Sequence, residues 1–138
     1  MYLSFNEYAD MGGTMDEATF NNFAFEAEAI IDYYTFNRLK HDTVVPEQVK
    51  RLMFALLDIA EKRRKTLALG MSNVQDSSDV YITRQSNDGV DTTYNGMSAA
   101  TLYQLCRTET NKAINFYLAS VVNEAGRRVL YRGLYPGE

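Results

Sequence analysis

Residues 20–38 constrain the fold of this chain more than any other stretch. Their apolar side chains recur at steps of three and four and so share one face of a helix: Phe20, Phe23, Ala24, Ala27, Ile30, Ile31 and Tyr34. Polar and acidic residues fall largely off that face, namely Asn21, Asn22, Glu26, Glu28 and Asp32. Because a helix with one apolar face must bury that face against a partner, the chain is predicted to be all-α, a small bundle of about four helices.

Capping signals mark the first two helices. Ser4 and Glu7 have the spacing of a capping box, so a short helix is expected to begin after Ser4 and to end at the glycines 12 and 13. Thr14 and Glu17 repeat that spacing immediately afterwards. The second helix is therefore predicted from about residue 15 to about residue 36.

The third and fourth helices have similar signals. Pro46 suits the first turn of a third helix and Gly70 its end, which places the cations of residues 62–65 in the last turns, where the helix dipole favours them. Ser98 is the predicted cap of a fourth helix from Ala99 to about Val122. The residues of this helix predicted to face inward are Leu102, Leu105, Cys106, Ala113, Phe116 or Tyr117, and Leu118.

Two segments lie outside this helical pattern. Residues 71–97 are rich in Ser, Asn, Asp, Thr and Gly, and the turn signal at 87–89 predicts either a long polar loop or a small hairpin that pairs residues 79–84 with residues 90–94. Residues 129–138 form an apolar and aromatic C-terminal tail. The predicted organisation is one helical domain, residues 1–128, with 71–97 as an insertion, followed by an extended tail of residues 129–138.

Charge is unevenly distributed along the chain. Residues 1–35 carry seven acidic and no basic residues, whereas residues 36–70 carry eight basic and four acidic ones. Such polarity pairs helices within one chain, or pairs one subunit with the next in a head-to-tail ring. The composition, 46% hydrophobic and 23% charged, is that of an ordinary soluble domain. Neither a signal peptide nor a membrane-spanning segment is expected.

Candidate chemical groups are few. His41, the single histidine, lies in a predicted loop without the motifs of a catalytic triad, and Cys106, the single cysteine, is expected to pack as a small hydrophobe in a reducing cytoplasm. The carboxylates expected on helices are Glu26, Glu28, Asp32, Asp58 and Glu61. They lack the Glu-x-x-His spacing of a di-iron site. Residues 76–91 do not match the spacing of a calcium-binding loop. No enzymatic activity, metal or cofactor is expected.

Several segments, in the same order, resemble one protein family. They are residues 31–39 (Ile-Asp-Tyr-Tyr-Thr-Phe-Asn-Arg-Leu), residues 45–51 (Val-Pro-Glu-Gln-Val-Lys-Arg), the opening Met-Tyr-Leu with Gly-Gly-Thr at 12–14, the turn at 86–89, and Val-Leu-Tyr-Arg-Gly at 129–133. In these segments the chain resembles the head–tail connector (adaptor, or head-completion) proteins of long-tailed bacteriophages and prophages of Gram-positive hosts. It departs from that family by continuing through residues 134–138.

This resemblance implies a structural virion protein with no enzymatic activity. Subunits of this kind are made in the bacterial host cytoplasm and assemble as a ring in the neck of the virion, here expected to be a dodecamer. The ring lies beneath the portal protein, joins the DNA-filled capsid to the stopper and tail, and extends the DNA channel. The expected partners are therefore the portal, the stopper or another neck protein, further copies of the chain, and genomic DNA that passes without sequence-specific binding.

Two segments are predicted to make the contacts that this role requires. The tail is expected to be the portal-docking element through Val129, Leu130, Tyr131, Arg132, Leu134 and Tyr135. It is expected to be disordered in the free subunit, because four helices already supply a core. The acidic residues of the long loop are Asp76, Asp79, Asp88 and Asp91. They are expected to face the lumen of the ring or the stopper and to repel the phosphates of the DNA.

An alternative function rests on the basic cluster at residues 62–65 (Lys-Arg-Arg-Lys). A small helical DNA-binding or regulatory protein would use this part of the third helix to contact phosphates, and its binding would weaken steeply with salt. For the connector, by contrast, the isolated chain is expected to be a monomer or weak oligomer that forms a stable ring only in the assembled neck.

Overall fold

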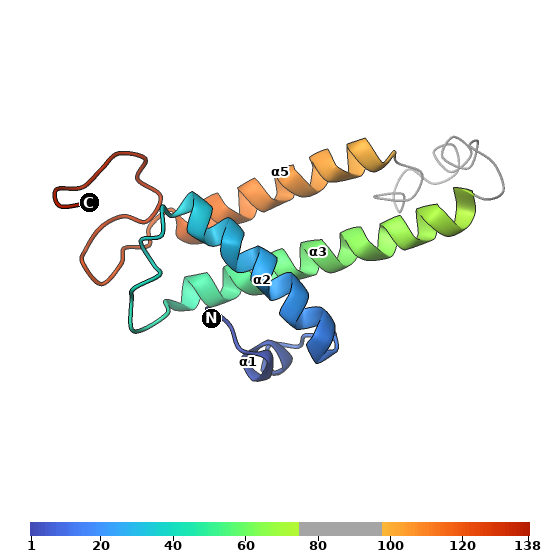
Figure 1. Ribbon diagram of the computed structural model, residues 1–138, viewed down its shortest axis with the longest axis horizontal. Coiled ribbons are helices and arrows are strands. Elements are labelled where there is room, and N and C mark those ends of the chain that lie inside the picture. Colours follow the sequence, from blue (N-terminus) through green and yellow to red (C-terminus); the bar gives the residue numbers. More distant parts are fainter. Residues whose placement is uncertain (75–97) are drawn as a thin grey trace. The chain divides into compact units, whose positions relative to one another are not determined.

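The computed structural model describes residues 1–74 and 98–138, with the side chains of residues 70–74 left aside. Its helices are α1 (Phe5–Asp10), α2 (Glu17–Tyr34), α3 (Glu47–Val74) and α5 (Ala99–Leu118), as Figure 1 shows. Within these described ranges the only strand-like pairing is one isolated antiparallel bridge, between Val122 and Arg128. The predicted all-α fold is therefore confirmed.

The chain divides into two compact units. The first contains Met1–Asp58 and Thr110–Glu138, and the second contains Ile59–Glu109. Helices α3 and α5 each contribute residues to both units. The C-terminal tail thus belongs to the same unit as α1 and α2.

Aromatic rings of α1 and α2 form one end of the first unit's core. Tyr8 lies 5.0 Å from the Phe20 ring of α2 and 5.5 Å from the Phe54 ring of α3, centroid to centroid. Ser4 caps α1 with the predicted capping box to Glu7, and both of its hydrogen bonds are present. The fully or almost fully buried residues elsewhere in this unit include Leu3, Ala24, Ala27, Ile31, Val49, Leu52, Met53, Leu57, Ile114, Leu118 and Val129.

Helix α2 begins later than the sequence predicts. Asp16, and not Thr14, is its N-cap, and the Asp16 carboxylate accepts hydrogen bonds from the Thr19 amide at 3.1 Å and the Thr19 hydroxyl at 2.6 Å. The Thr14 amide, which a capping box would bond to the Glu17 side chain, donates instead to the Tyr8 hydroxyl at 3.2 Å, as does the amide of Met15. A tertiary contact to α1 therefore overrides the local capping signal.

Helix α3 continues beyond its predicted end. It passes through Gly70 and ends at Val74, since a single glycine lowers helix stability by only about 1 kcal/mol and does not forbid a helix. The last turn of α3 contains no basic residue. The expectation that residues 62–65 complement the helix dipole at that end is therefore wrong, because they lie more than about two turns before it.

In the second unit these cations have side-chain partners nearby. Lys65 Nζ lies 3.2 Å from the Glu61 carboxylate, one turn earlier on α3. The Arg63 guanidinium lies over the Tyr103 ring of α5, 5.7 Å from its centroid. Both contacts neutralise or cover charge within the chain.

Helix α5 begins as predicted and ends earlier. The Ser98 hydroxyl accepts from the Thr101 amide at 3.2 Å, whereas the helix stops at Leu118, about one turn before the predicted end. Phe116, predicted as one of two alternatives to face inward, is 80% exposed. Leu118 is buried as predicted, and so is Ile114, which was not among the predicted residues. A residue two positions from each must lie on the opposite side of the helix.

The predicted insertion is described only at its beginning. Residues 71–74 belong to α3. The alternatives of a polar loop and a hairpin concern residues 75–97, which lie outside the described part of the chain.

Candidate functional site

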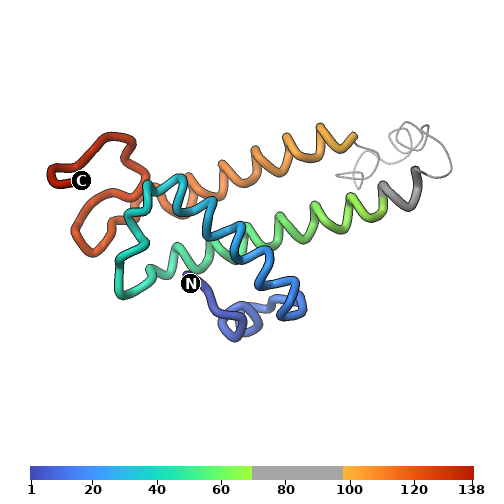
Figure 2. Tube along the Cα trace, viewed as in Figure 1, coloured from blue at the N-terminus to red at the C-terminus, as the bar shows by residue number. Residues whose placement is uncertain are grey.

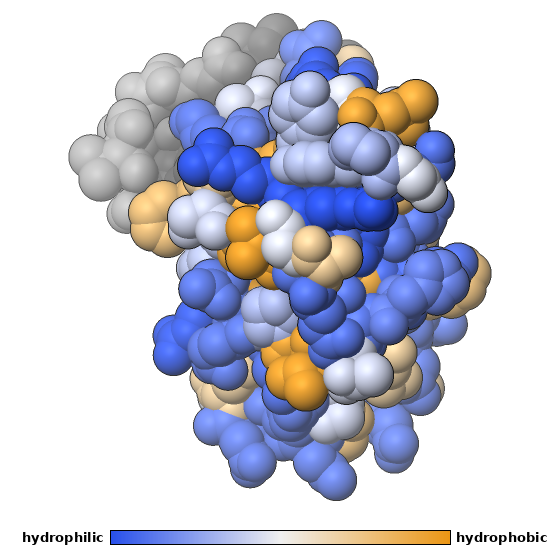
Figure 3. All heavy atoms as spheres, turned by 90° about the vertical axis from the view of Figure 1, so that its left-hand side faces the viewer, coloured by the Kyte–Doolittle hydropathy of each residue, from blue (hydrophilic) through white to orange (hydrophobic). Residues whose placement is uncertain are grey.

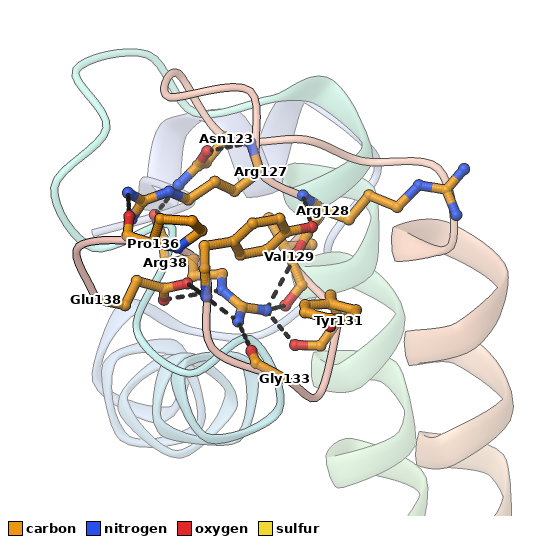
Figure 4. Close-up of polar contacts among 10 residues, drawn as sticks. Arg38, Asn123, Arg127, Arg128, Val129, Tyr131, Gly133, Pro136 and Glu138 are labelled. Carbon is orange, nitrogen blue, oxygen red and sulfur yellow. Dashed lines mark hydrogen bonds and ion pairs between the residues drawn. The ribbon is translucent and has the colours of Figure 1, made fainter.

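The most elaborate polar arrangement in the first unit surrounds Arg38 (Figure 4). Although it is charged, Arg38 is only 7% exposed, and its guanidinium donates six hydrogen bonds. Four of them go to main-chain carbonyl oxygens, those of Arg128, Val129, Tyr131 and Gly133. The other two go to the side-chain carboxylate of Glu138, at 3.1 Å from Nε and 3.3 Å from Nη2. We call Arg38 with these tail acceptors the Arg38 clasp.

Aromatic rings surround the same guanidinium. Its central carbon lies 4.9 Å from the centroid of the Tyr135 ring, 5.1 Å from that of Phe36 and 5.9 Å from that of Tyr131. A guanidinium suits this position because it is planar, stacks on rings and presents five N–H donors in a fixed geometry. A lysine ammonium could not reach the same set of acceptors.

The turn after α2 delivers Arg38 to this position. Phe36 and Asn37 adopt left-handed backbone angles, with φ of 54° and 59°, and such residues cost about 1–3 kcal/mol each unless their surroundings hold them. The buried Thr35 hydroxyl donates to the Ile31 carbonyl at 2.7 Å, and the Asn37 amide donates to the Asp32 carbonyl at 2.9 Å. These bonds close the turn and direct Arg38 back toward the core.

A second turn, after α5, presents the acceptors. The Val129 amide donates to the Val121 carbonyl at 3.1 Å, and the Asn123 side chain accepts from the Arg127 amide at 2.9 Å. Asn123 also donates to the main-chain carbonyl of Arg38, at 3.2 Å. Each of the two turns therefore donates a hydrogen bond to the other.

The tail is part of the folded unit, so the expectation that it is disordered in the free subunit is wrong. It folds back against the turn that follows α2 (Figure 2), and Val129 is fully buried. The rings of Tyr131 and Tyr135 lie 4.9 Å apart, and the Tyr135 hydroxyl accepts from the Arg128 amide at 3.0 Å. The physical reason is the Arg38 clasp, which supplies donors for a backbone that would otherwise need an outside partner.

The six residues predicted to dock the portal are now divided by exposure. Val129 is buried, and Leu130 and Tyr135 are half-buried. Tyr131 is 50% exposed, Leu134 is 82% exposed, and Arg132 is also exposed. Figure 3 shows that the face at this end of the molecule is mainly hydrophilic, with separate hydrophobic residues among the polar ones. Of these six residues, the exposed ones are therefore Tyr131, Arg132 and Leu134.

A groove of about 600 Å³ lies beside the tail, between the end of α2 and the second half of α5. Its walls carry the aromatic side chains of Tyr33, Tyr34 and Phe36, the amides of Asn111 and Asn115, and the tail residues Leu130 and Arg132. The Tyr34 hydroxyl donates to Asn111 at 2.8 Å and so fixes one wall. The lining thus combines aromatic faces, side-chain amides, one cation and the Asp32 carboxylate.

The acidic residues on the flank of α2 anchor the N-terminus. Tyr2 donates through its hydroxyl to the Asp32 carboxylate and through its amide to Glu28 at 2.7 Å. Burial, together with the hydrogen bond to Asp32, raises the pKa of Tyr2. The carboxylates of Glu28 and Asp32 thus have a structural role.

The remaining candidate groups do not form a site with one another. His41 is exposed in the loop after α2, and Cys106 is buried, where burial raises the pKa of its thiol. Among the described residues no cluster of three or more His, Cys, Asp or Glu side chains could hold a metal ion. The four aspartates predicted to face the lumen, Asp76, Asp79, Asp88 and Asp91, lie outside the described residues, as does the segment compared with a calcium loop.

Protonation of Glu138 is expected to weaken the clasp. Hydrogen bonds from Arg38 and from the Tyr135 amide lower the pKa of Glu138 below its ordinary value of 4.5. A carboxylate with a lowered pKa in the folded state stabilises that state fully above the unfolded-state pKa, and the contribution disappears as pH falls through the folded-state pKa. We therefore expect the difference in free energy of unfolding between the wild type and E138Q to be constant near neutral pH and to shrink below about pH 4.5.

Urea unfolding at a series of pH values measures this difference. E47Q is the matched control, because Glu47 forms an exposed ion pair with Arg51 at 3.3 Å, a type of pair that contributes little to stability. A difference for E138Q that stays constant down to pH values where the protein unfolds in acid would contradict the prediction.

Comparisons with known proteins give no relative. No family model, no curated protein and no solved structure matches the chain. Of the helices in the described ranges, none is long and apolar enough to cross a membrane.

Proposed function

We propose that this protein is a head–tail connector (adaptor) of a long-tailed bacteriophage or prophage. In this role its subunits form a ring beneath the portal, in the neck of the virion, and join the DNA-filled capsid to the stopper and tail. The ring extends the channel through which the genome passes. The protein has no enzymatic role in this proposal.

One observation carries the proposal. Two of the segments in which the chain resembles the connector family, residues 31–39 and 129–133, are about 90 positions apart in the chain. Arg38, from the first segment, donates to the carbonyl oxygens of Val129, Tyr131 and Gly133 in the second. Two segments that resemble the same family, although far apart in the chain, are therefore in direct contact in the fold. Such a contact supports a common origin of the two similarities.

The tail is proposed to dock the portal in the conformation that the Arg38 clasp imposes. Its backbone is already bonded, so docking would use the exposed side chains of Arg132 and Leu134 and would avoid the cost of ordering a free segment. Arginine is among the residue types that contribute most to binding energy at interfaces. The acidic residues of the long loop remain proposed to face the lumen or the stopper.

The experiment that tests the function begins with the neighbouring genes. If a portal gene lies upstream, the two proteins can be co-expressed and the complex examined by electron microscopy. We expect an additional ring on the portal face that points away from the capsid. Absence of phage structural genes nearby, together with salt-sensitive binding to duplex DNA that K62E and R64E abolish, would favour the alternative DNA-binding function.

Substitution of the outward-facing tail residues should separate docking from folding. We expect L134D combined with R132E to reduce the affinity for the portal by about tenfold or more, while the midpoint of thermal unfolding changes little because both side chains are exposed. V44D is the matched control, since Val44 is 71% exposed and lies in the loop after α2. Unchanged portal binding of the double variant would place the docking surface elsewhere.

A further inference from the structure

Helix α2 is apolar on two opposite sides. One side is the buried stripe of Phe20, Ala24, Ala27 and Ile31. On the other side Phe25 is 74% exposed and Tyr33 is 76% exposed, with exposed Ala29 one turn from each. Phe36, 49% exposed, continues this line just beyond the helix. We call Phe25, Ala29, Tyr33 and Phe36 the outer strip.

A strip of this kind indicates an interface. A surface helix normally carries polar residues opposite its core face, and a helix that is apolar on both sides is expected to be buried on both sides. Two of the aromatic side chains also have neighbours that hold them in place. The Tyr33 ring packs edge-on against the Tyr34 ring, with 5.3 Å between the ring centroids, and the Arg38 guanidinium lies over the Phe36 ring. Rigid, exposed aromatic residues are typical of the energetic centre of protein–protein contacts.

Charge restricts what can cover the outer strip. Helix α2 contains four acidic residues and no basic residue, and helical positions put Glu26 on one flank of the strip and Asp32 on the other. Packing the outer strip against the same strip of another copy would bring like charges together, which disfavours a two-fold symmetric contact. The partner surface should therefore combine an apolar residue with cations.

The same chain carries such a surface on α5. Phe116 is 80% exposed and packs edge-on against Tyr117 at 5.0 Å, so its ring also has a defined orientation. Lys112, one turn earlier, is exposed on the same side of the helix. Both residues lie opposite the buried positions Ile114 and Leu118. We call Lys112 and Phe116 the α5 knob.

We propose that the outer strip of one copy binds the α5 knob of a second copy. Both surfaces belong to the first compact unit, so every copy presents one of each. A contact between two different surfaces repeats from copy to copy and closes into a ring where the rotation permits it. The inference rests on the proposed function, for which it names the contact between neighbouring subunits.

Mixing two defective variants tests this contact. F25E combined with Y33E blocks the outer strip, and K112E combined with F116E blocks the α5 knob. We expect each variant alone to lose self-association by about tenfold or more, measured by chemical crosslinking and sedimentation over a concentration series. An equal mixture should regain a contact, because each variant retains the surface that the other lacks, and it should stop at heterodimers.

The controls distinguish the other arrangements. V44E, at another exposed apolar position of the same unit, should associate as the wild type does, and circular dichroism should show that all variants remain helical. Strip-to-strip packing predicts that the knob variant associates normally and that mixing restores nothing. Either of those results would overturn the inference. The inference also requires the isolated chain to be a weak oligomer and not a strict monomer, so a wild type that stays monomeric under crosslinking at every concentration would overturn it as well.

The inference and the proposed function can fail separately. Heterodimers in the mixture without any binding to a portal would leave the subunit contact standing and would remove the connector role. Portal-bound rings that form equally well from the strip variant would remove the contact alone. Binding of the outer strip to an unrelated basic protein, without self-association, would replace the second copy as its occupant.

Discussion

Replacement of Arg38 by alanine is expected to destabilise the protein by about 3–5 kcal/mol. The substitution removes the donor of six hydrogen bonds, and four main-chain carbonyls then lack that donor. Each buried acceptor that stays unpaired costs about 1–3 kcal/mol, so the loss is a large part of the 5–15 kcal/mol that stabilises a typical domain. R38K should lose most of the same stability, because an ammonium lacks the planar array of donors.

Chemical denaturation of R38A, R38K and R128A measures this effect. Arg128 is the matched control, since its guanidinium is exposed and extends away from the clasp in Figure 4. R128A is expected to change the free energy of unfolding by no more than about 0.5 kcal/mol. Equal stabilities of R38A and R128A would mean that the tail does not depend on Arg38.

The parts of the fold that sequence predicts well are those fixed by neighbouring residues. The Ser4–Glu7 box and the Ser98 cap depend on residues three positions apart, and both are present. The core face of α2 follows from helical periodicity alone, and Phe20 and Ile31 are fully buried. Where a distant residue intervenes, the local signal fails. The Tyr8 hydroxyl accepts from the Thr14 amide, which is then not available to the Glu17 side chain, and Asp16 is the N-cap of α2.

The Arg38 clasp could not be predicted from the sequence, because it too depends on residues far apart in the chain. Four of its six acceptors are backbone carbonyls, which every residue possesses and which leave no mark in the sequence. Its geometry also needs left-handed angles at Phe36 and Asn37, and a phenylalanine gives no hint of them because bulky residues rarely adopt that conformation. The one available signal was an arginine directly after an aromatic helix end, in a chain whose tail is aromatic as well.

The outer strip shows a different limit. Periodicity assigns Phe25 and Tyr33 to the side away from the core, where sequence reasoning had placed only polar residues. Their exposure, 74% and 76%, makes the strip visible as a surface. A pattern of hydrophobic residues predicts which residues are buried somewhere, but it does not separate burial within one chain from burial between chains.

Removal of residues 129–138 is expected to destabilise the first unit strongly. A tail that is disordered in the free subunit, as the sequence predicts, would be dispensable for folding. The structure leads to the opposite expectation. Truncation removes the fully buried Val129, worth about 1.5–3 kcal/mol for an aliphatic side chain. It also removes most of the acceptors of the Arg38 guanidinium and the two tail rings that cover it, so the contacts of the Arg38 clasp are lost and the guanidinium is hydrated instead.

A double-mutant cycle between the truncation and R38M identifies the cause. In the full-length chain R38M should destabilise, because the tail carbonyls and Glu138 lose their donor. In the truncated chain the same substitution should change the free energy of unfolding little, because the guanidinium has already lost its tail acceptors and the tail rings that cover it. Thermal and urea unfolding of the four proteins give the coupling energy between Arg38 and the tail. If R38M destabilises both chains by the same amount, Arg38 and the tail are not coupled, and the buried guanidinium must find its partners elsewhere in the unit.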